Sequence, residues 1–363
     1  MWMSLGINRG MALNNTCRGR ATAANKQQFL AVTSDEGGKV SVYPINQTTG
    51  LGVKLADPSV VPGGIGEDVA FAPDGSAIAV AHTSTPFISV YAFSASGGIG
   101  AKFANPLTLP TGAGYGVAFS PSGNAIAVSH ANSPLITAYS WSSAGFGAKF
   151  ANPAVLAAGT GLDVTFSPTG NAVVLTELTG GIHAWEWSDT GFGLKYADPA
   201  TTPVGQGRAN QVAFSPDGAV VATVVSGQSF NSNKVYVYQW SASTGFGTRY
   251  PQPTPSIAAY LGYWGVAFSR QGDAIFIFGA GGGGPQGPQA WAWSNASGFG
   301  ATYANPNLME GQSISIDYSL EGDIIAAAEA VWPWSSASGF GPRFANPSVM
   351  PVGTRRSTAF GRA

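Results

Sequence analysis

The sequence predicts an all-β fold, a seven-bladed β-propeller of four-stranded antiparallel blades, and two repeating motifs carry this prediction. The first motif, typically Gly-Phe-Gly-x-Lys-Phe-Ala-Asn-Pro, begins at Gly50, Gly98, Gly145, Gly191, Gly245, Gly298 and Gly339. The second, typically Phe-Ser-Pro-x-Gly, places an aromatic residue at Phe71, Phe119, Phe166, Phe214, Phe268, Tyr318 and Phe360. Successive aromatic residues are 42 to 54 positions apart, a spacing typical of propeller blades.

Composition supports one closed body of short strands. A repeat that runs almost through all 363 residues favours a single domain, and 50 Gly with 24 Pro suit many tight turns. The net charge is −1 and the basic residues are scattered, so we expect neither nucleic acid nor a membrane surface as a partner. The single cysteine, Cys17, cannot form an intramolecular disulfide. No signal peptide or membrane span is recognisable, so we expect a soluble protein.

Each blade is expected to follow one order of elements. In the second blade, strands at 69–71, 77–81 and 88–91 are followed by the Gly98 cassette, and the turn at 73–75 joins the first two strands. Third strands end in aromatic pairs one residue apart, such as Trp185 and Trp187. This spacing puts both rings on one face of a strand, and we interpret them as packing between adjacent blades.

The two ends of the chain predict how the ring closes. Residues 1–28 lie outside the repeat and are expected to form an N-terminal arm, with the propeller spanning 29–363. The segment 355–360 matches a first strand, whereas the blade that starts at Phe29 lacks one. We therefore expect the C-terminal strand to complete the N-terminal blade. The alternative is that Gly10-Met-Ala-Leu13 supplies this strand.

The Phe-Ser-Pro-x-Gly repeats resemble those of WD-repeat and lactonase-like seven-bladed propellers over residues 29 to 360. The chain lacks recurring Gly-His and Trp-Asp pairs, so the hydrogen-bond network of true WD repeats is expected to be absent. The glycine cassette is similar to spacers of propeller-repeat proteins from tailed phages. This second resemblance implies a virion structural component.

Candidate binding residues gather on the face where the loops differ between repeats, because positions that vary among near-identical copies are not required by the blade. Around the channel mouth, we expect a polar site made of Glu67, Asp68, His82, Tyr115, His130, Asp163, Glu177, Asn210, Gln211, Trp264, Arg355 and Arg356. Two insertions, 226–234 and 279–289, enlarge the same face.

The favoured function is a non-enzymatic structural or attachment module of a virion, such as a tail or capsid appendage. Its expected partners are other virion or assembly proteins, or a host receptor or glycan, within a larger assembly. No catalytic residue and no cofactor is predicted, since the familiar nucleophile-elbow, P-loop and metalloprotease motifs are absent.

Two alternatives stay open. A carbohydrate-binding propeller would use Tyr115 and Trp264 as its contact surface. The lactonase resemblance instead implies a calcium-dependent hydrolase, with calcium held by Glu67, Asp68 and Asp163, and with His82 or His130 as general base.

Overall fold

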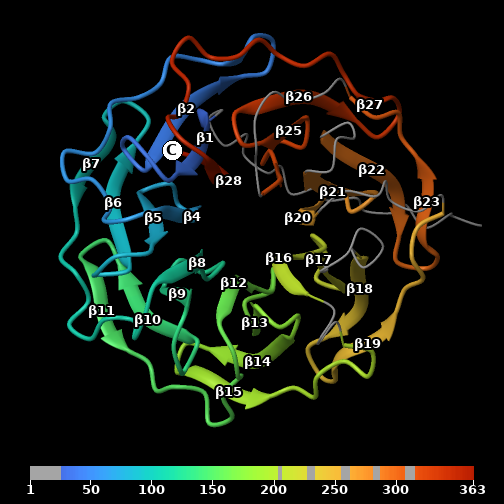
Figure 1. Ribbon diagram of the computed structural model, residues 1–363, viewed down its shortest axis with the longest axis horizontal. Coiled ribbons are helices and arrows are strands. Elements are labelled where there is room, and N and C mark those ends of the chain that lie inside the picture. Colours follow the sequence, from blue (N-terminus) through green and yellow to red (C-terminus); the bar gives the residue numbers. More distant parts are fainter. Residues whose placement is uncertain (1–25, 203–206, 227–233, 255–261, 281–286, 307–314) are drawn as a thin grey trace, which may run out of the picture.

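The computed structural model describes residues 26–202, 207–226, 234–254, 262–280, 287–306 and 315–363. These residues form seven four-stranded antiparallel sheets arranged as a ring around a central channel (Figure 1). The predicted seven-bladed propeller is therefore confirmed. The described part of the chain has no helix that could span a membrane.

The strands fall into four classes by their distance from the channel. The innermost strands are β4 (Gly66–Phe71), β8 (Gly114–Phe119), β12 (Gly161–Phe166), β16 (Arg208–Phe214), β20 (Gly262–Phe268), β24 (Asp317–Tyr318) and β28 (Arg355–Arg362). The second strands are β1 (Gln28–Ser34), β5 (Ala77–His82), β9 (Ala125–His130), β13 (Ala172–Glu177), β17 (Val220–Ser226), β21 (Ala274–Ala280) and β25 (Ile324–Ala327).

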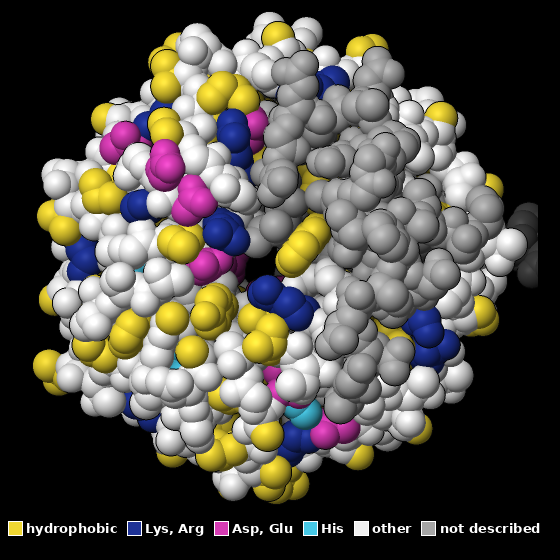
Figure 2. All heavy atoms as spheres, viewed as in Figure 1, with side chains coloured by type: hydrophobic (Ala, Val, Ile, Leu, Met, Phe, Trp, Pro, Cys, Tyr) yellow, Lys and Arg dark blue, Asp and Glu magenta, His cyan; other side chains and the backbone are white. Residues whose placement is uncertain are grey.

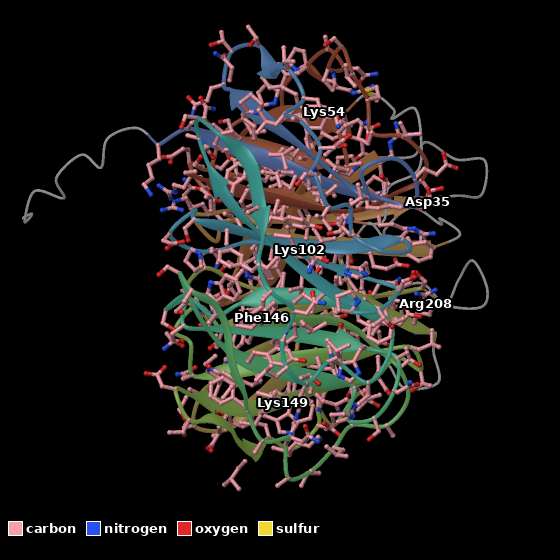
Figure 3. The ribbon with its side chains drawn as sticks, turned by 90° about the vertical axis from the view of Figure 1, so that its left-hand side faces the viewer. Asp35, Lys54, Lys102, Phe146, Lys149 and Arg208 are labelled. Atoms are coloured by element: carbon pink, nitrogen blue, oxygen red, sulfur yellow. The ribbon has the colours of Figure 1, made fainter. Side chains whose placement is uncertain are left out.

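The third strands are β2 (Val40–Asn46), β6 (Ile88–Ser94), β10 (Ile136–Ser142), β14 (Ile182–Ser188), β18 (Lys234–Ser241), β22 (Gly287–Ser294) and β26 (Ala330–Ser335). The outer strands are β3 (Gly50–Leu51), β7 (Gly98–Lys102), β11 (Gly145–Lys149), β15 (Gly191–Lys195), β19 (Gly245–Arg249), β23 (Gly298–Thr302) and β27 (Gly339–Phe340). Each outer strand therefore begins at the first glycine of a cassette. The lysines Lys54, Lys102 and Lys149, near the ends of three such strands, follow one another along the rim in Figure 3.

The Pro-x-Gly turns join innermost to second strands as predicted. At Pro73-Asp-Gly75, the Gly75 N–H donates to the carbonyl of Ala72 at 2.9 Å, and Gly75 has a φ of 81°. Side chains with a Cβ rarely adopt this left-handed conformation, so glycine is the residue that the turn requires.

Aromatic rings hold neighbouring blades together. The Trp141 ring on β10 lies 5.0 Å from Phe103, which follows the outer strand of the previous blade. It also lies 5.6 Å from Phe119 and 5.2 Å from Phe146 of its own blade. All three contacts are edge-on, an arrangement worth about 0.5–1.5 kcal/mol per pair beyond the burial of apolar area. The aromatic pairs of the third strands are thus packing groups, as interpreted from the sequence.

Aspartates of three innermost strands tie their blades to the next one along the chain. Asp68, Asp163 and Asp317 accept the backbone N–H groups of Val117, Val212 and Phe360, each at 2.8 Å. Every acceptor and its donor lie on innermost strands of adjacent blades. These bonds replace the water that the amides would otherwise bind, so they fix the channel wall.

The ring closes at the N-terminal blade, whose strand order is β28-β1-β2-β3. Leu30 pairs with Phe360 and Ala31 with Ala359 in this antiparallel ladder. The C-terminal closure is therefore confirmed. The alternative strand Gly10–Leu13 and most of the predicted arm 1–28 lie outside the described residues, so the boundary of the arm stays a prediction.

Deleting residues 355–363 should lower the unfolding temperature by at least about 10 °C, because β1 loses its whole neighbouring strand and both ring ends become sheet edges. Differential scanning calorimetry of the truncated chain measures this shift. Deleting residues 10–13 is the matched control and should leave the transition nearly in place. The reverse result would assign the closure to the N-terminal segment.

The contribution of Asp317 to stability should grow as the pH falls from 7 to 4. Burial raises its pKa to about 6, from an ordinary value of 3.8. The folded state therefore binds a proton more tightly than the unfolded chain, and this residue contributes about 3 kcal/mol that is present below pH 4 and lost as the pH rises through 6. Urea unfolding at several pH values should show that the stability of the wild type, relative to that of Asp317→Asn, rises as the pH falls from 7 to 4. Parallel profiles would show that Asp317 does not titrate in this way.

Candidate active site at the channel mouth

A β-bulge near the start of the innermost strands builds the channel mouth. In the second blade, Gly66 pairs with His82 and Asp68 with Ala81, so Glu67 has no partner on β5. A bulged residue leaves the ladder, and its side chain is aimed away from the regular sheet direction. The same break in pairing occurs at Tyr115, Leu162, Asn210 with Gln211, Trp264, and Arg356 with Ser357.

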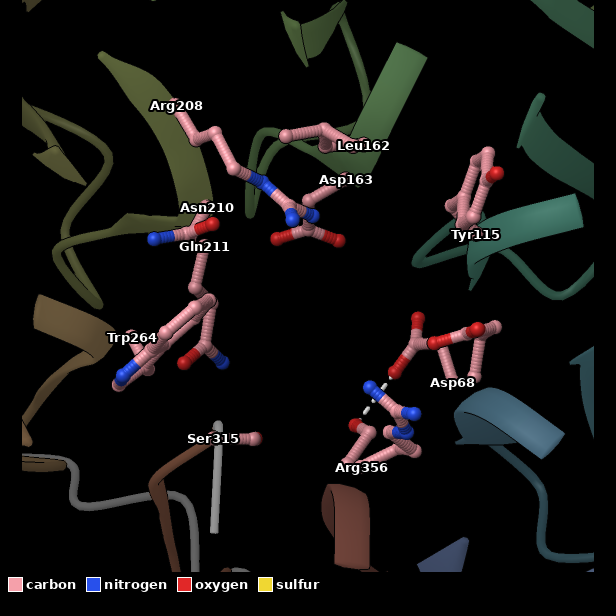
Figure 4. Close-up of a pocket in the computed structure, with 12 residues that line it drawn as sticks. Asp68, Tyr115, Leu162, Asp163, Arg208, Asn210, Gln211, Trp264, Ser315 and Arg356 are labelled. Carbon is pink, nitrogen blue, oxygen red and sulfur yellow. Dashed lines mark hydrogen bonds between the residues drawn. The ribbon is translucent and has the colours of Figure 1, made fainter. Parts of the chain in front are cut away.

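These bulged residues line one pocket of about 80 Å³ at the channel mouth (Figure 4). Its lining comprises Glu67, Asp68, Tyr115, Leu162, Asp163, Arg208, Asn210, Gln211, Trp264, Ser315, Arg356 and Ser357. Charged side chains of both signs surround the central opening in Figure 2. In the edge-on view of Figure 3, Arg208 lies on the same face of the disc as Asp35.

The structure brings together eight of the predicted site residues, namely Glu67, Asp68, Tyr115, Asp163, Asn210, Gln211, Trp264 and Arg356. His82, His130, Glu177 and Arg355 do not line this pocket. The two insertions expected beside the mouth lie largely outside the described residues. The pocket therefore lies on the predicted face, but four of the twelve predicted residues do not line it.

The two histidines are structural groups inside their blades. His82 and His130 are fully buried at the ends of β5 and β9. Their Nε2 atoms lie 3.0 Å from the Ser89 hydroxyl and 2.9 Å from the Thr137 hydroxyl, respectively. Burial lowers the pKa of each imidazole to about 4. The prediction of either one as a general base at the mouth is therefore wrong, because neither reaches the pocket.

Glu177 and Arg355 are also engaged away from the pocket. The Thr179 hydroxyl donates to Glu177 at 2.5 Å, and His183, which bonds Asp198 at 2.9 Å, lies beside the same carboxylate. Burial acts to raise the pKa of Glu177, but the hydrogen bonds from His183 and Thr179 outweigh it and lower that pKa. Arg355 donates from Nε to the buried Glu329 at 3.1 Å. Both residues stabilise blades and offer little to a ligand.

Asp68 and Asp163 form the floor of the pocket, and their oxygens are already occupied. Asp68 accepts the Ser357 hydroxyl at 2.5 Å in addition to its amide bond, and Asp163 accepts the amides of Val164 and Val212. Burial raises the pKa of both carboxyls. Among the described residues, no group of three acidic, His or Cys side chains could hold a metal ion. The set Glu67, Asp68 and Asp163 therefore does not fit a calcium site.

Glu67 differs from these aspartates, because its carboxylate makes no hydrogen bond within the described part of the chain. Burial raises its pKa, Arg356 and Arg208 act to lower it, and Asp68 and Asp35 raise it further. The net effect is a carboxyl whose pKa is above its ordinary value, in the same pocket as the guanidinium groups of Arg208 and Arg356. Such a group in a pocket is typical of a proton-transfer site.

Leu162, Arg208, Ser315 and Ser357 line the pocket but were not among the predicted site residues, and Arg208 is the charged one of these four. Arg208 comes one position before Ala209. Ala209 pairs with Val225 and is the last paired residue before its bulge, as Gly66, which pairs with His82, is in the second blade. The Arg208 guanidinium carbon lies 5.9 Å from the centroid of the Trp264 ring, within the range of a cation–π contact. The signal was available, since Arg208 is a basic residue at the start of an innermost strand. Trp264 is itself half-buried beneath this group, so it offers less open ring surface than the carbohydrate alternative requires.

No protein-family model matches the sequence, and no curated protein matches it. Solved structures with the same fold are found at low identity. A candidate 6-phosphogluconolactonase from Bacteroides uniformis has a TM-score of 0.65 at 13% identity, covering 93% of this chain and 100% of that one. A periplasmic gluconolactonase from Pseudomonas aeruginosa has a TM-score of 0.69 at 16% identity, covering 93% and 99%. A protein from Lactobacillus plantarum has a TM-score of 0.71 at 12% identity, covering 93% and 100%.

The neighbours with a named activity are lactonases, and this contradicts our prediction of a non-enzymatic structural or attachment protein. The comparisons support neither the expected resemblance to phage structural proteins nor the expected virion location. At these identities the likeness shows the fold, a lactonase-like seven-bladed propeller, and the predicted assembly partners stay predictions.

Proposed function

We propose that this protein is a hydrolase that opens a small lactone, a cyclic ester, in the pocket at the channel mouth. The observation that carries the proposal is Glu67, a carboxylate with a raised pKa that is held on a bulge and lines the same pocket as Arg208 and Arg356. The neighbours named as lactonases support the same reaction class, since they share this fold.

The reaction needs one base and one group that stabilises negative charge. Glu67 takes a proton from a water molecule as the water oxygen attacks the lactone carbonyl carbon. The carbonyl oxygen becomes an oxyanion, which the guanidinium of Arg208 or Arg356 stabilises. When the tetrahedral intermediate collapses, the bond to the ring oxygen breaks and this oxygen takes the proton from Glu67. The product is an open-chain hydroxy acid, and Glu67 returns to its ionised state.

The remaining side chains hold the pocket in shape. Asp68 and Asp163 stay bonded to backbone amides and keep the floor rigid. The side-chain oxygen Oε1 of Gln211 accepts the N–H of Val266 at 3.1 Å, which fixes the floor on the side of β16 and β20.

Glu67→Gln should lower kcat/KM for glucono-1,5-lactone by about 10²-fold or more, because the amide cannot accept the water proton. Proton release measured at constant pH, after subtraction of spontaneous hydrolysis, gives the rate. Glu321→Gln, which changes a carboxyl in the β24–β25 turn, is the matched control and should keep wild-type activity. Equal rates for wild type and Glu67→Gln would remove Glu67 from the reaction, and no enzymatic rate with any lactone would remove the proposed function.

The rate should increase with pH through the raised pKa of Glu67 and then level off, since only the ionised carboxylate accepts a proton. Arg356→Gln removes one of the guanidinium groups that lower this pKa, so the acidic limb of the kcat/KM profile should move to higher pH. A profile from pH 4 to 8 for both proteins tests this expectation. An acidic limb that stays in place would show that Arg356 does not act on the base.

A further inference from the structure

Two of the arginines at the channel mouth lack a close carboxylate partner. Arg355 is neutralised by Glu329 at 3.1 Å, but the nearest ion-pair partner of its neighbour Arg356 is Asp35, at 3.9 Å. In the described residues, Arg208 makes no ion pair, and it packs against the Trp264 ring instead. Figure 4 shows both guanidinium groups projecting into the pocket.

Within the described residues, the floor aspartates Asp68 and Asp163 form no ion pair with these two guanidinium groups. Asp68 and Asp163 point their oxygens at backbone amides and at the Ser357 hydroxyl. Asp35 is likewise anchored, since it accepts the N–H of Thr354 at 2.7 Å. Glu67 is therefore the main acidic group that competes with a bound anion for the two guanidinium groups.

Guanidinium groups recognise carboxylates by charge-assisted hydrogen bonds. A lactone is neutral in its reacting group, whereas the acid formed by its hydrolysis carries a carboxylate at the carbon that was attacked. The pair of arginines consequently suits the product better than the substrate.

We infer that the mouth pocket is a binding site for small carboxylates and that the protein is inhibited by the hydroxy acid it forms. The inference rests on the proposed function for the origin of this ligand, but binding itself requires no turnover. Ionised Glu67 repels the bound carboxylate, so the charge on Glu67 limits affinity and promotes product release.

The test is calorimetric titration of the full-length protein with gluconate at pH 7, with sorbitol as a neutral polyol of similar size. Gluconate should bind and sorbitol should not. Arg208→Gln and Arg356→Gln should each weaken gluconate binding by about ten-fold or more, because each removes a charged hydrogen-bond donor. Glu67→Gln should tighten binding by about ten-fold, because it removes a neighbouring negative charge.

Arg270→Gln is the matched control, since Arg270 lines the opposite end of the channel and lies outside the mouth pocket. It should bind gluconate like the wild type. Thermal unfolding of every variant verifies that the fold is kept. Absence of gluconate binding to the wild type, equal affinity for sorbitol, or unchanged affinity in both mouth arginine variants would overturn the inference.

Lactone hydrolysis and gluconate binding are measured separately, so the proposed function and the inference can be contradicted independently. Gluconate binding that depends on Arg208 and Arg356 without lactone hydrolysis would keep the carboxylate site and remove the proposed function. Lactone hydrolysis without competitive inhibition by gluconate would keep the proposed function and overturn the inference.

Discussion

The site depends on a break in strand pairing that recurs near the start of the innermost strands. A regular antiparallel ladder would turn alternate side chains toward the neighbouring blades, where aromatic rings fill the space. The bulge releases one or two residues from this constraint and directs them to the channel. Blade packing can therefore stay uniform while Glu67, Tyr115, Trp264 and Arg356 give the mouth its own chemistry.

The acidic side chains beside the bulge have two different roles. The carboxylates of Asp68 and Asp163 are hydrogen-bonded within the fold, whereas the carboxylate of Glu67, on the bulge itself, is not hydrogen-bonded by any described residue. Asp68 and Asp163 accept amides of the next blade, so their carboxylates act as connectors between strands. Glu67, one residue from Asp68, has no such partner within the described residues and shares the pocket with the guanidinium groups of Arg208 and Arg356. Of these two adjacent residues, Asp68 thus stabilises the fold and Glu67 is the group proposed to react.

The fold could be read from the sequence because its determinants are local. Pro-x-Gly turns and glycine cassettes specify hairpins within a few residues, and their period gives the blade number. The closing strand at 355–360 followed from the same turn chemistry. The site was harder, because the roles of its residues depend on distant partners. Asp68 looked like a metal ligand, and its amide partner Val117 lies in another blade.

The histidines show the same limit. His82 and His130 stand at matching positions near variable loops, yet register places their rings inside the blades. Arg208 is the first residue of β16, two positions before the bulge at Asn210 and Gln211, and this bulge is longer than that of the second blade. Function was misjudged for a related reason, since a regular repeat with scattered charge gives no sign of which charges remain unpaired at the mouth.

The most direct test of the account is a crystal structure of the protein grown with gluconate. The account predicts Glu67 on a bulge, outside the β4–β5 ladder, with the gluconate carboxylate in contact with the guanidinium groups of Arg208 and Arg356. A Glu67 side chain packed between blades, or a ligand bound away from both arginines, would contradict it.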